Sequence, residues 1–554
     1  MNLSSGSCAT KLFISVAVAL LIAMAPQDLV AQDFPNVSVD DEYLPGHLWV
    51  RFVDDALPVT GGGRTGYAVF DQSAAAYGVF SVEKGFPFVD AMARNRRLLE
   101  HADALRSVYI VRYRGQYAAG IVAAELARDP AVIYAEPYYI RRTVGMLPPP
   151  GVGALPDVPH DPLFKDEAFM ARMRMTDAWD VVKGESGDVV IAIIDSGPFW
   201  RHEDLIDNVW TNPGEVADNG IDDDNNGFVD DVHGWNFTDD KPDPTGADIQ
   251  AQWHGTQMTG AAAAVADNEK GSAGTSWNAR FMPISISCAG VPGSLCYAPQ
   301  GVVYAAMNGA DIINASWGGT RPAATDTIIL RALREEGALM VASAGNAGVN
   351  IDEKPFYPAA YLETLSVGGT ASHADVSFLN FGSTVDVFAA AEGVHSTFPP
   401  PYHYNTTGGT SGAAALVSGI AALVKTIHPT YTGDQIREQL RLTADNIDSE
   451  NAPELHGLLG RGRVNAYRAV TESGIPAVRL TDWNWIDSGG DSKDLRSSET
   501  MTITAEFTNY LADAEGLTLE LVSDSPHITV SSGPETVGTL ALSLIHISEP
   551  TRPY

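Results

Sequence analysis

Three polar residues, Asp195, His254 and Ser411, have the side chains that serine-dependent hydrolysis requires: an acid, a base and a hydroxyl nucleophile. Asp195 follows an apolar run, His254 precedes small residues, and Ser411 lies where a polar turn becomes a long apolar stretch. Each residue alone also fits a structural role as a helix cap, an ion-pair partner or a core side chain. Their order of acid, base and nucleophile is one of the known orders of such a triad.

Short motifs around these residues make the chemistry more specific. They are Asp195-Ser196-Gly197, His254-Gly255-Thr256, Ala344-Gly345-Asn346 and Gly409-Thr410-Ser411. Taken together and in this order, they resemble the signatures of the subtilisin-like serine proteases, the subtilases, over residues 40 to 475. Gln257, Ala415 and Leu416 depart from the usual pattern beside these motifs.

The resemblance implies a site and a reaction. Asp195 would orient His254, which would take the proton of Ser411, while Asn346 and the Ser411 N–H would bind the oxyanion. Ser316, Trp317 and Gly318 would form the strand edge that pairs with protein or peptide substrates. We therefore predict a secreted serine endopeptidase, made as a self-processing zymogen and acting through an acyl-enzyme. The alternative is a catalytically silent relative that binds peptides or serves in surface display.

Apolar runs alternate with helical patterns in the region that carries these motifs. Residues 188–194, 310–316 and 338–343 read as buried strands, and residues 300–308 and 326–336 read as helices between them. This alternation predicts an α/β fold with a mostly parallel sheet sandwiched by helices. Catalytic groups in such folds lie at the carboxyl ends of the strands.

The rest of the chain divides into segments that differ in composition and in predicted structure. A Lys followed by a short apolar core predicts a signal peptide over residues 1–31, and hence export of a bacterial type and an extracellular location. We expect a ferredoxin-like α+β prodomain at 32–145, a linker at 146–158, the catalytic domain at 159–475 and the start of a β-sandwich module at 476–541. Residues 542–554 resemble a translated sequencing adapter, and we expect them to be foreign to the natural chain.

Charge and resemblance together define the expected partners. The 69 acidic residues outnumber the 35 basic ones, which gives a net charge of -34. Such a charge disfavours nucleic acid and anionic membranes as partners, and no membrane association is expected after signal cleavage. The resemblance implies that the prodomain acts as an intramolecular inhibitor, cut off between about residues 140 and 160.

An acidic stretch at residues 219–233 has the alternating oxygen ligands of a calcium loop. Like charges at this density repel each other unless a cation neutralises them, although a solvated acidic turn is the alternative. The predicted ligands of a structural Ca²⁺ are Asp222, Asp224, Asn226 and the Phe228 carbonyl, with Asp230 or Asp231 completing the shell. Separately, Cys288 and Cys296 lie eight positions apart and are either a disulfide or two free thiols.

Overall fold

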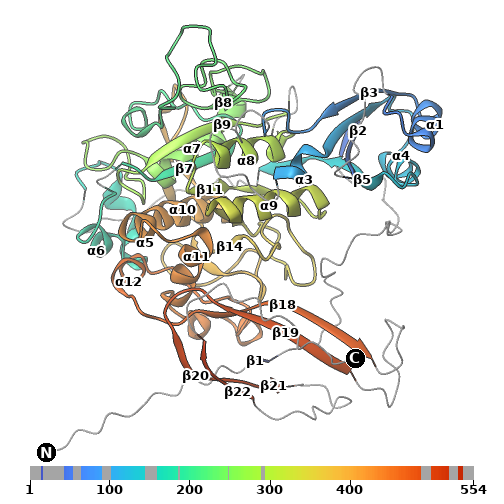
Figure 1. The fold of residues 1–554 in the computed structure, drawn as a ribbon. Coiled ribbons are helices and arrows are strands. Elements are labelled where there is room, and N and C mark those ends of the chain that lie inside the picture. The colour runs from blue at the N-terminus through green and yellow to red at the C-terminus, as the bar shows by residue number, and fades with distance from the viewer. Residues whose placement is uncertain are drawn as a thin grey trace, which may run out of the picture. The chain divides into compact units, whose positions relative to one another are not determined.

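The computed structural model describes residues 14–15, 43–53, 64–89, 102–143, 159–184, 187–246, 249–288, 293–487, 501–522 and 535–540 (Figure 1). The expected linker, the adapter-like residues 542–554 and nearly all of the expected signal peptide lie outside these ranges. The chain forms two compact units: residues 29–471 in one, residues 1–28 and 472–554 in the other.

The centre of the larger unit is a parallel sheet of seven strands. Its β7 (Val190–Asp195) consists of aliphatic residues and one terminal acid, and every residue in it is buried. The sheet order is β15-β14-β13-β11-β7-β9-β8, and all neighbouring strands run parallel. The other strands are β8 (Trp235–Asn236), β9 (Arg280–Ser285), β11 (Ile312–Ala315), β13 (Leu339–Ser343), β14 (Leu365–Thr370) and β15 (Val387–Ala390).

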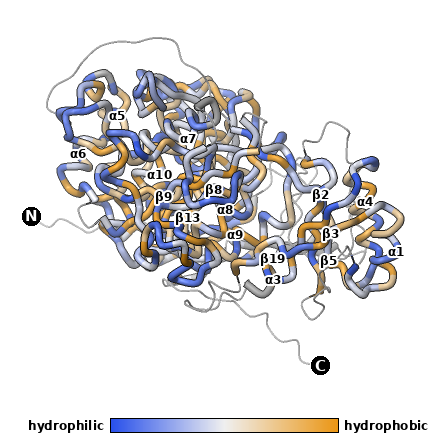
Figure 2. The backbone as a smooth tube through the Cα atoms, turned by 90° about the horizontal axis from the view of Figure 1, so that it is seen from above, coloured by the Kyte–Doolittle hydropathy of each residue, from blue (hydrophilic) through white to orange (hydrophobic). Residues whose placement is uncertain are grey.

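Helices cover both faces of this sheet, as the alternation in the sequence predicted. Successive side chains of a strand point to opposite faces. Ile191 and Ile193 of β7 therefore pack with α7 (Ile249–Ala263) and α10 (Gly409–Ile427). Ala192 and Ile194 pack with α8 (Ala298–Met307) and α9 (Ala324–Glu336). Hydrophobic residues concentrate along α10 and the central strands, whereas outer loops are largely hydrophilic (Figure 2). The α/β fold class is confirmed.

The helix α10 is the main buried helix of the larger unit. Its residues from Gly409 to Val424 are all buried. It has the length and hydropathy of a membrane span, but the window concerned is 83% buried within the protein, and no other described helix passes the same test. Short helices α5 (Ala168–Arg172), α6 (Met175–Trp179), α11 (Gly433–Leu442) and α12 (Ala466–Thr471) and the hairpin β16 (Val394–Thr397) with β17 (Tyr404–Thr407) complete this side.

The N-terminal part of the same unit is a four-stranded antiparallel sheet in the order β3-β4-β2-β5. Its strands are β2 (Tyr43–Phe52), β3 (Val79–Lys84), β4 (Val108–Tyr113) and β5 (Val132–Tyr139). The helices α1 (Ala68–Ala76) and α4 (Ala119–Leu126) share one hydrophobic core with the sheet. Trp49, Tyr134 and Tyr138 belong to a second core, which continues into α8 and α9. The short α3 (Ala102–Arg106) precedes β4.

One short strand links this sheet to the region of the seven-stranded sheet. After β5 the chain forms β6 (Arg141–Thr143), which pairs antiparallel with β10 (Ser294–Leu295) on one side and with β12 (Trp317–Gly318) on the other. The strand β6 is therefore the middle strand of a three-stranded sheet whose other two strands come from the region of the seven-stranded sheet.

The smaller unit contains paired strands. The strands β18 (Val478–Asp487) and β19 (Met501–Asn509) are antiparallel, as are β20 (Ala514–Leu519) and β22 (Glu535–Leu540). Ile14–Ser15 (β1) pairs with Leu521–Val522 (β21). The Asn509 side chain ties the pairs together, because its amide donates to the Leu540 carbonyl at 2.9 Å. The β-sandwich stays a prediction.

Candidate active site

The end of β7 and the middle of α7 bring an acid and a base together. Asp195 is the last residue of β7, and both of its carboxylate oxygens lie 2.9 Å from Nδ1 of His254. The two side chains are 0% and 2% exposed. Among the described residues, Nε2 of His254 is buried without a hydrogen-bond partner. Asp195 therefore fixes the imidazole so that its second nitrogen is left for another group.

A reciprocal pair of hydrogen bonds holds Ser411 at the start of α10. The Ser411 hydroxyl donates to the Ser316 carbonyl at 3.0 Å, and the Ser316 hydroxyl donates to the Ser411 carbonyl at 2.9 Å. Ser316 directly follows β11, so this pair joins the first turn of α10 to a carboxyl end of the sheet. The backbone N–H groups of that first turn have no helical partner and favour negative charge.

Asn346 follows β13 and contacts the same helix start. Its side-chain oxygen accepts hydrogen bonds of 2.9 Å from both the N–H and the hydroxyl of Thr410. Gly409 has a φ of +73°, and a Cβ there would lie 2.5 Å from Nδ2 of Asn346, so only glycine fits. The Asn346 amide is thereby oriented with its oxygen engaged and its nitrogen over Gly409. Sequence reasoning missed this role of Thr410.

The residues that depart from the family pattern keep the site intact. Gln257 is buried on α7, and its side-chain amide donates to the Thr406 carbonyl at 2.9 Å. Ala415 and Leu416 lie in uninterrupted α10, and the Leu416 carbonyl accepts a 2.8 Å hydrogen bond from the Thr275 hydroxyl. The substitutions thus fit the surrounding helices.

A position for an extended chain, which we call the groove, lies between β10 and β12 beside these groups and is filled by β6. Trp317 pairs with Thr143 and Gly318 pairs with Arg142 in the antiparallel register of β12 and β6. On the other side of β6, the Thr143 N–H donates to the Gly293 carbonyl at 3.1 Å. The predicted substrate strand Ser316–Gly318 therefore contacts a main chain in the pairing mode expected of a peptide substrate.

The acidic loop gathers some of its predicted ligands. Carboxylate oxygens of Asp222, Asp224 and Glu215 lie within 4.8 Å of one another. Glu215 was not predicted, because it lies outside the repeating pattern. Burial is the largest influence on Glu215 and raises its pKa, and the nearby Asp224 and Asp222 raise it further. Three carboxylates this close to one another are a candidate cation site.

The other predicted side-chain ligands of the loop take part in hydrogen bonds within the protein. Asp230 accepts hydrogen bonds from the backbone N–H groups of Asn219 and Gly220, each at 3.0 Å. Asp231 is buried, and the Tyr304 hydroxyl donates to it at 2.5 Å. Burial raises the pKa of Asp231 to about 7. The Asn226 side-chain amide donates to Asp231 and to Asp224, and the Phe228 ring packs on Tyr304. Whether these residues and the Phe228 carbonyl bind a cation stays a prediction.

A second carboxylate cluster was missed by the sequence analysis. Asp204 is fully buried, and the amide of Asn268 donates to it at 2.7 Å. Asp161 accepts the backbone N–H groups of Asp267 and Asn268. Burial raises the pKa of Asp204 to about 8, and the charge of Asp161 adds to this shift. The two acids are far apart in sequence, so no motif predicts that Asn268 donates to both of them.

The two cysteines of the catalytic region are joined in the structure. Cys288 and Cys296 form a disulfide with an S–S distance of 2.12 Å. Cys296 directly follows β10, so the disulfide lies next to the strand that pairs with β6.

A parallel sheet with a buried acid–histidine pair, and a serine at a helix start beside its strand ends, defines an α/β serine hydrolase. The model of the subtilase family, Peptidase_S8, matches residues 186–462. Thermitase from Thermoactinomyces vulgaris is 31% identical over 314 residues, which are 56% of this chain and 99% of that protein. A thermophilic serine proteinase from Bacillus sp. (strain AK1) is 30% identical over 371 residues, 67% of this chain and 80% of that protein.

A third relative extends further along the chain. The halolysin-like extracellular serine protease Nep of Natrialba magadii is 31% identical over 401 residues, 70% of this chain and 68% of that protein. The chain belongs to the subtilase family. It is a serine-type endopeptidase, so the resemblance drawn from the four motifs is confirmed.

Proposed function

We propose that this subtilase cleaves peptide bonds through Asp195, His254 and Ser411, with Asn346 in the oxyanion hole. The observation that carries this proposal is the pair of 2.9 Å contacts from the Asp195 carboxylate to Nδ1 of His254. A carboxylate on Nδ1 fixes the tautomer in which Nε2 can accept a proton, and it stabilises the imidazolium that follows.

The first step begins at the Ser316 carbonyl. This carbonyl accepts a hydrogen bond from the Ser411 hydroxyl. Ser316 is also the residue next to Trp317, and would be the next pairing position for a chain that pairs with β12. A substrate N–H that pairs with Ser316 would release the hydroxyl to turn toward Nε2 of His254. His254 then takes the proton as Ser411 attacks the substrate carbonyl, and it returns the proton to the leaving amine.

Negative charge then develops on the former carbonyl oxygen. The Ser411 N–H at the start of α10 and the Asn346 amide would donate to this oxygen. The Asn346 side chain is held for this task because its oxygen is bound twice by Thr410. The resulting acyl-enzyme is hydrolysed when His254 activates a water molecule.

We further propose that residues 32–145 are an inhibitory prodomain. β6 fills the groove strand position, and Glu136 of β5 accepts hydrogen bonds from Ala324 N at 2.9 Å and Thr325 N at 3.1 Å. These N–H groups begin α9, whose own N-cap, Ala323, has no side-chain cap. Glu136 thus caps a helix of residues 159–475, which we take as the catalytic domain of the mature enzyme.

Export of this enzyme is part of the same proposal. The apolar N-terminal segment has the pattern of a signal peptide. The relative from Natrialba magadii is described as extracellular. An inhibited precursor would protect the exporting cell until the prodomain is removed.

The test is to purify the secreted protein and to sequence its new N-terminus. Thr143 pairs with Trp317, the residue next to Ser316, so the cut is expected within one or two residues after Thr143. The processed enzyme should hydrolyse casein. A mature chain that begins before Arg141, or a processed protein that leaves casein intact, would refute the proposal.

The association of the cut prodomain with the mature enzyme should depend on pH. Burial raises the pKa of Glu136 to about 7 from its ordinary 4.5, and the hydrogen bonds from α9 lower it less. A raised carboxyl pKa means that docking is favoured in full below about pH 4.5 and weakens as pH rises through about 7. The cut prodomain should therefore co-purify at pH 5 and dissociate at pH 8, and Glu136→Gln should remove this difference.

We propose that Ca²⁺ stabilises the catalytic domain, and the donor set fits. Asp222, Asp224 and Glu215 offer carboxylate oxygens of the kind that Ca²⁺ prefers. The buried Asp204, near Asp161, is a second position where a cation would offset the cost of an ionised carboxylate. Bound calcium would supply charge neutralisation in these loops and no chemistry at Ser411.

Removal of calcium should therefore lower the melting temperature. For inhibited enzyme, we expect chelation to lower Tm by roughly 5–10 °C, the scale for losing a ligand held well above its Kd. Asp222→Asn with Asp224→Asn should reduce this shift, and Asp204→Asn, tested alone, reports the second position. An unchanged Tm on chelation in the wild type and in all variants would exclude both positions.

A further inference from the structure

A buried arginine lies in the substrate groove. The Arg141 side chain of β6 is 5% exposed, and its Nη2 lies 2.5 Å from Oδ2 of Asp326. Its Nη1 donates to the Arg321 carbonyl at 3.0 Å. Charged side chains are almost never buried so deeply without a dedicated partner. The groove therefore contains a position whose acid and carbonyl both match a guanidinium.

The surroundings of Asp326 hold its carboxylate beside the Arg141 guanidinium. The Tyr361 hydroxyl lies 3.3 Å from Oδ2 of Asp326 and also binds Ala323, so it holds the carboxylate in place. Asp326 is in the first turn of α9, where the helix dipole favours a negative charge. Gly319 leaves room for the guanidinium, because a Cβ at this position would lie only 3.1 Å from Nη1 of Arg141.

The neighbouring arginine shows that this contact depends on position. Arg142 is exposed, whereas Arg141 is buried. Arg142 pairs with Gly318, and Thr143 pairs with Trp317, so a substrate strand in this register would present its next residue at Ser316 beside the Ser411 hydroxyl. Counted back from that reacting residue, Arg141 occupies the fourth position.

We propose that Asp326 determines specificity and selects polypeptides with an arginine at the fourth residue before the cut bond. This inference rests on the proposed function, because it assumes that the groove beside Ser411 binds substrates. Asp326, Gly319 and Tyr361 belong to the catalytic region and stay when the prodomain leaves. A bound arginine would regain the hydrogen-bonded ion pair, while a leucine would leave the Asp326 carboxylate covered and unpaired.

The test uses mature enzyme and quenched peptides that copy residues 138–148. The parent peptide is compared with one that has leucine in place of Arg141 and with a control that has leucine in place of Arg142. Loss of a charge-assisted hydrogen-bonded pair should lower kcat/KM by roughly 10- to 100-fold for the first substitution, and the control should change little. Mass spectrometry of the products should show the cut directly after the third residue that follows the arginine.

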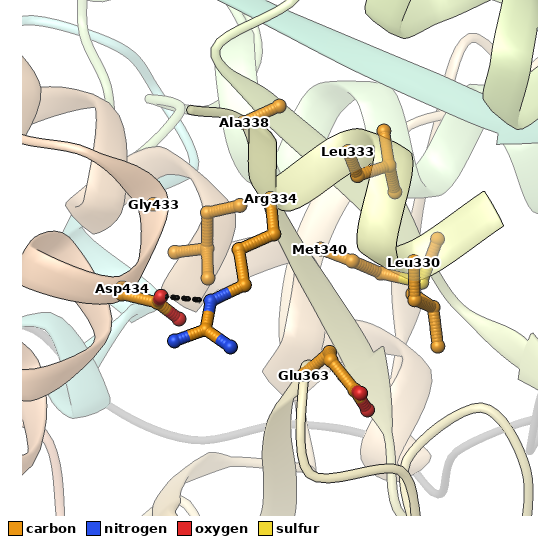
Figure 3. A pocket seen from close by; sticks show the side chains of 9 residues that line it. Leu330, Leu333, Arg334, Ala338, Met340, Glu363, Gly433 and Asp434 are labelled. Carbon is orange, nitrogen blue, oxygen red and sulfur yellow. Dashed lines mark hydrogen bonds and ion pairs between the residues drawn. The ribbon is translucent and has the colours of Figure 1, made fainter. Parts of the chain in front are cut away.

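Two enzyme variants complete the experiment. Asp326→Asn should bring kcat/KM for the parent peptide and for the peptide with leucine in place of Arg141 to within about threefold of each other, because the charge partner of the arginine is gone. Asp434→Asn is the matched control: it removes the acid from another arginine ion pair, with Arg334 at the far end of α9 (Figure 3). This control should keep the full preference. Because Asp326→Asn also removes the partner of Arg141 in the precursor, a double variant with Arg141→Gln is made as well. It keeps failed maturation from being mistaken for lost specificity.

The outcomes separate this inference from the proposed function. If the wild type cleaves the leucine peptide as fast as the parent, or if Asp326→Asn keeps the preference, Asp326 is not a specificity residue although the protease is active. If the wild type cleaves none of the peptides and no casein, the proposed function itself fails.

Discussion

Ser411→Ala should remove peptide hydrolysis and leave the fold unchanged. Loss of the nucleophile lowers kcat by about 10⁶ in enzymes of the subtilisin type, and only oxyanion stabilisation and binding remain. We therefore expect this variant to accumulate as the uncut precursor and to leave casein intact. The measurement is gel analysis and casein hydrolysis after expression in a host that lacks extracellular proteases.

A serine on the same helix provides the control. Ser418 lies seven residues further along α10, is equally buried, and donates to Asn314 and to the Ala414 carbonyl. Ser418→Ala removes a similar hydroxyl, yet it should mature and hydrolyse casein. If Ser411→Ala matures and cleaves casein like the wild type, another residue is the nucleophile.

Asp195→Asn should lower kcat by about 10⁴, because the amide NH₂ replaces a carboxylate oxygen beside Nδ1 and, as a donor, would favour the wrong tautomer of His254. Asn is similar in size to Asp and can occupy the same position beside His254, so the melting temperature should change little. Kinetics on a soluble peptide, with the same preparation tested for its melting curve, distinguish lost chemistry from lost folding.

A double-mutant cycle tests whether the two residues work as a unit. If Asp195 acts only through His254, adding Asp195→Asn to His254→Ala should cost little further activity. Fully additive losses would instead assign Asp195 an independent role. The buried contacts of 2.9 Å between the two side chains favour the first outcome.

The arrangement of the site could be predicted where it depends on local patterns. Aliphatic runs mark β7, β11 and β13, and alternation with helices makes these strands parallel, so their ends must meet at one edge. Asp195, Ser316 and Asn346 follow from this rule alone. The start of α10 is similarly local, because a polar turn leads directly into an apolar run.

Contacts between distant segments could not be predicted in this way. Arg141 and Asp326 are 185 positions apart, and no motif links Glu215 to the acidic loop. The helix α1 and the strand β3 were also missed. β3 has a single fully buried residue, Val82, and so lacks the strong hydrophobic alternation that marks the central strands.

The position of β6 between β10 and β12 has a consequence for how targets are attacked. Both edges of the occupying strand are used, so only an extended main chain can enter, and a helix or a paired strand in a target cannot. A folded target must first open locally at the bond to be cut. Its rate of digestion is then governed by the free energy of that opening as well as by its side chains.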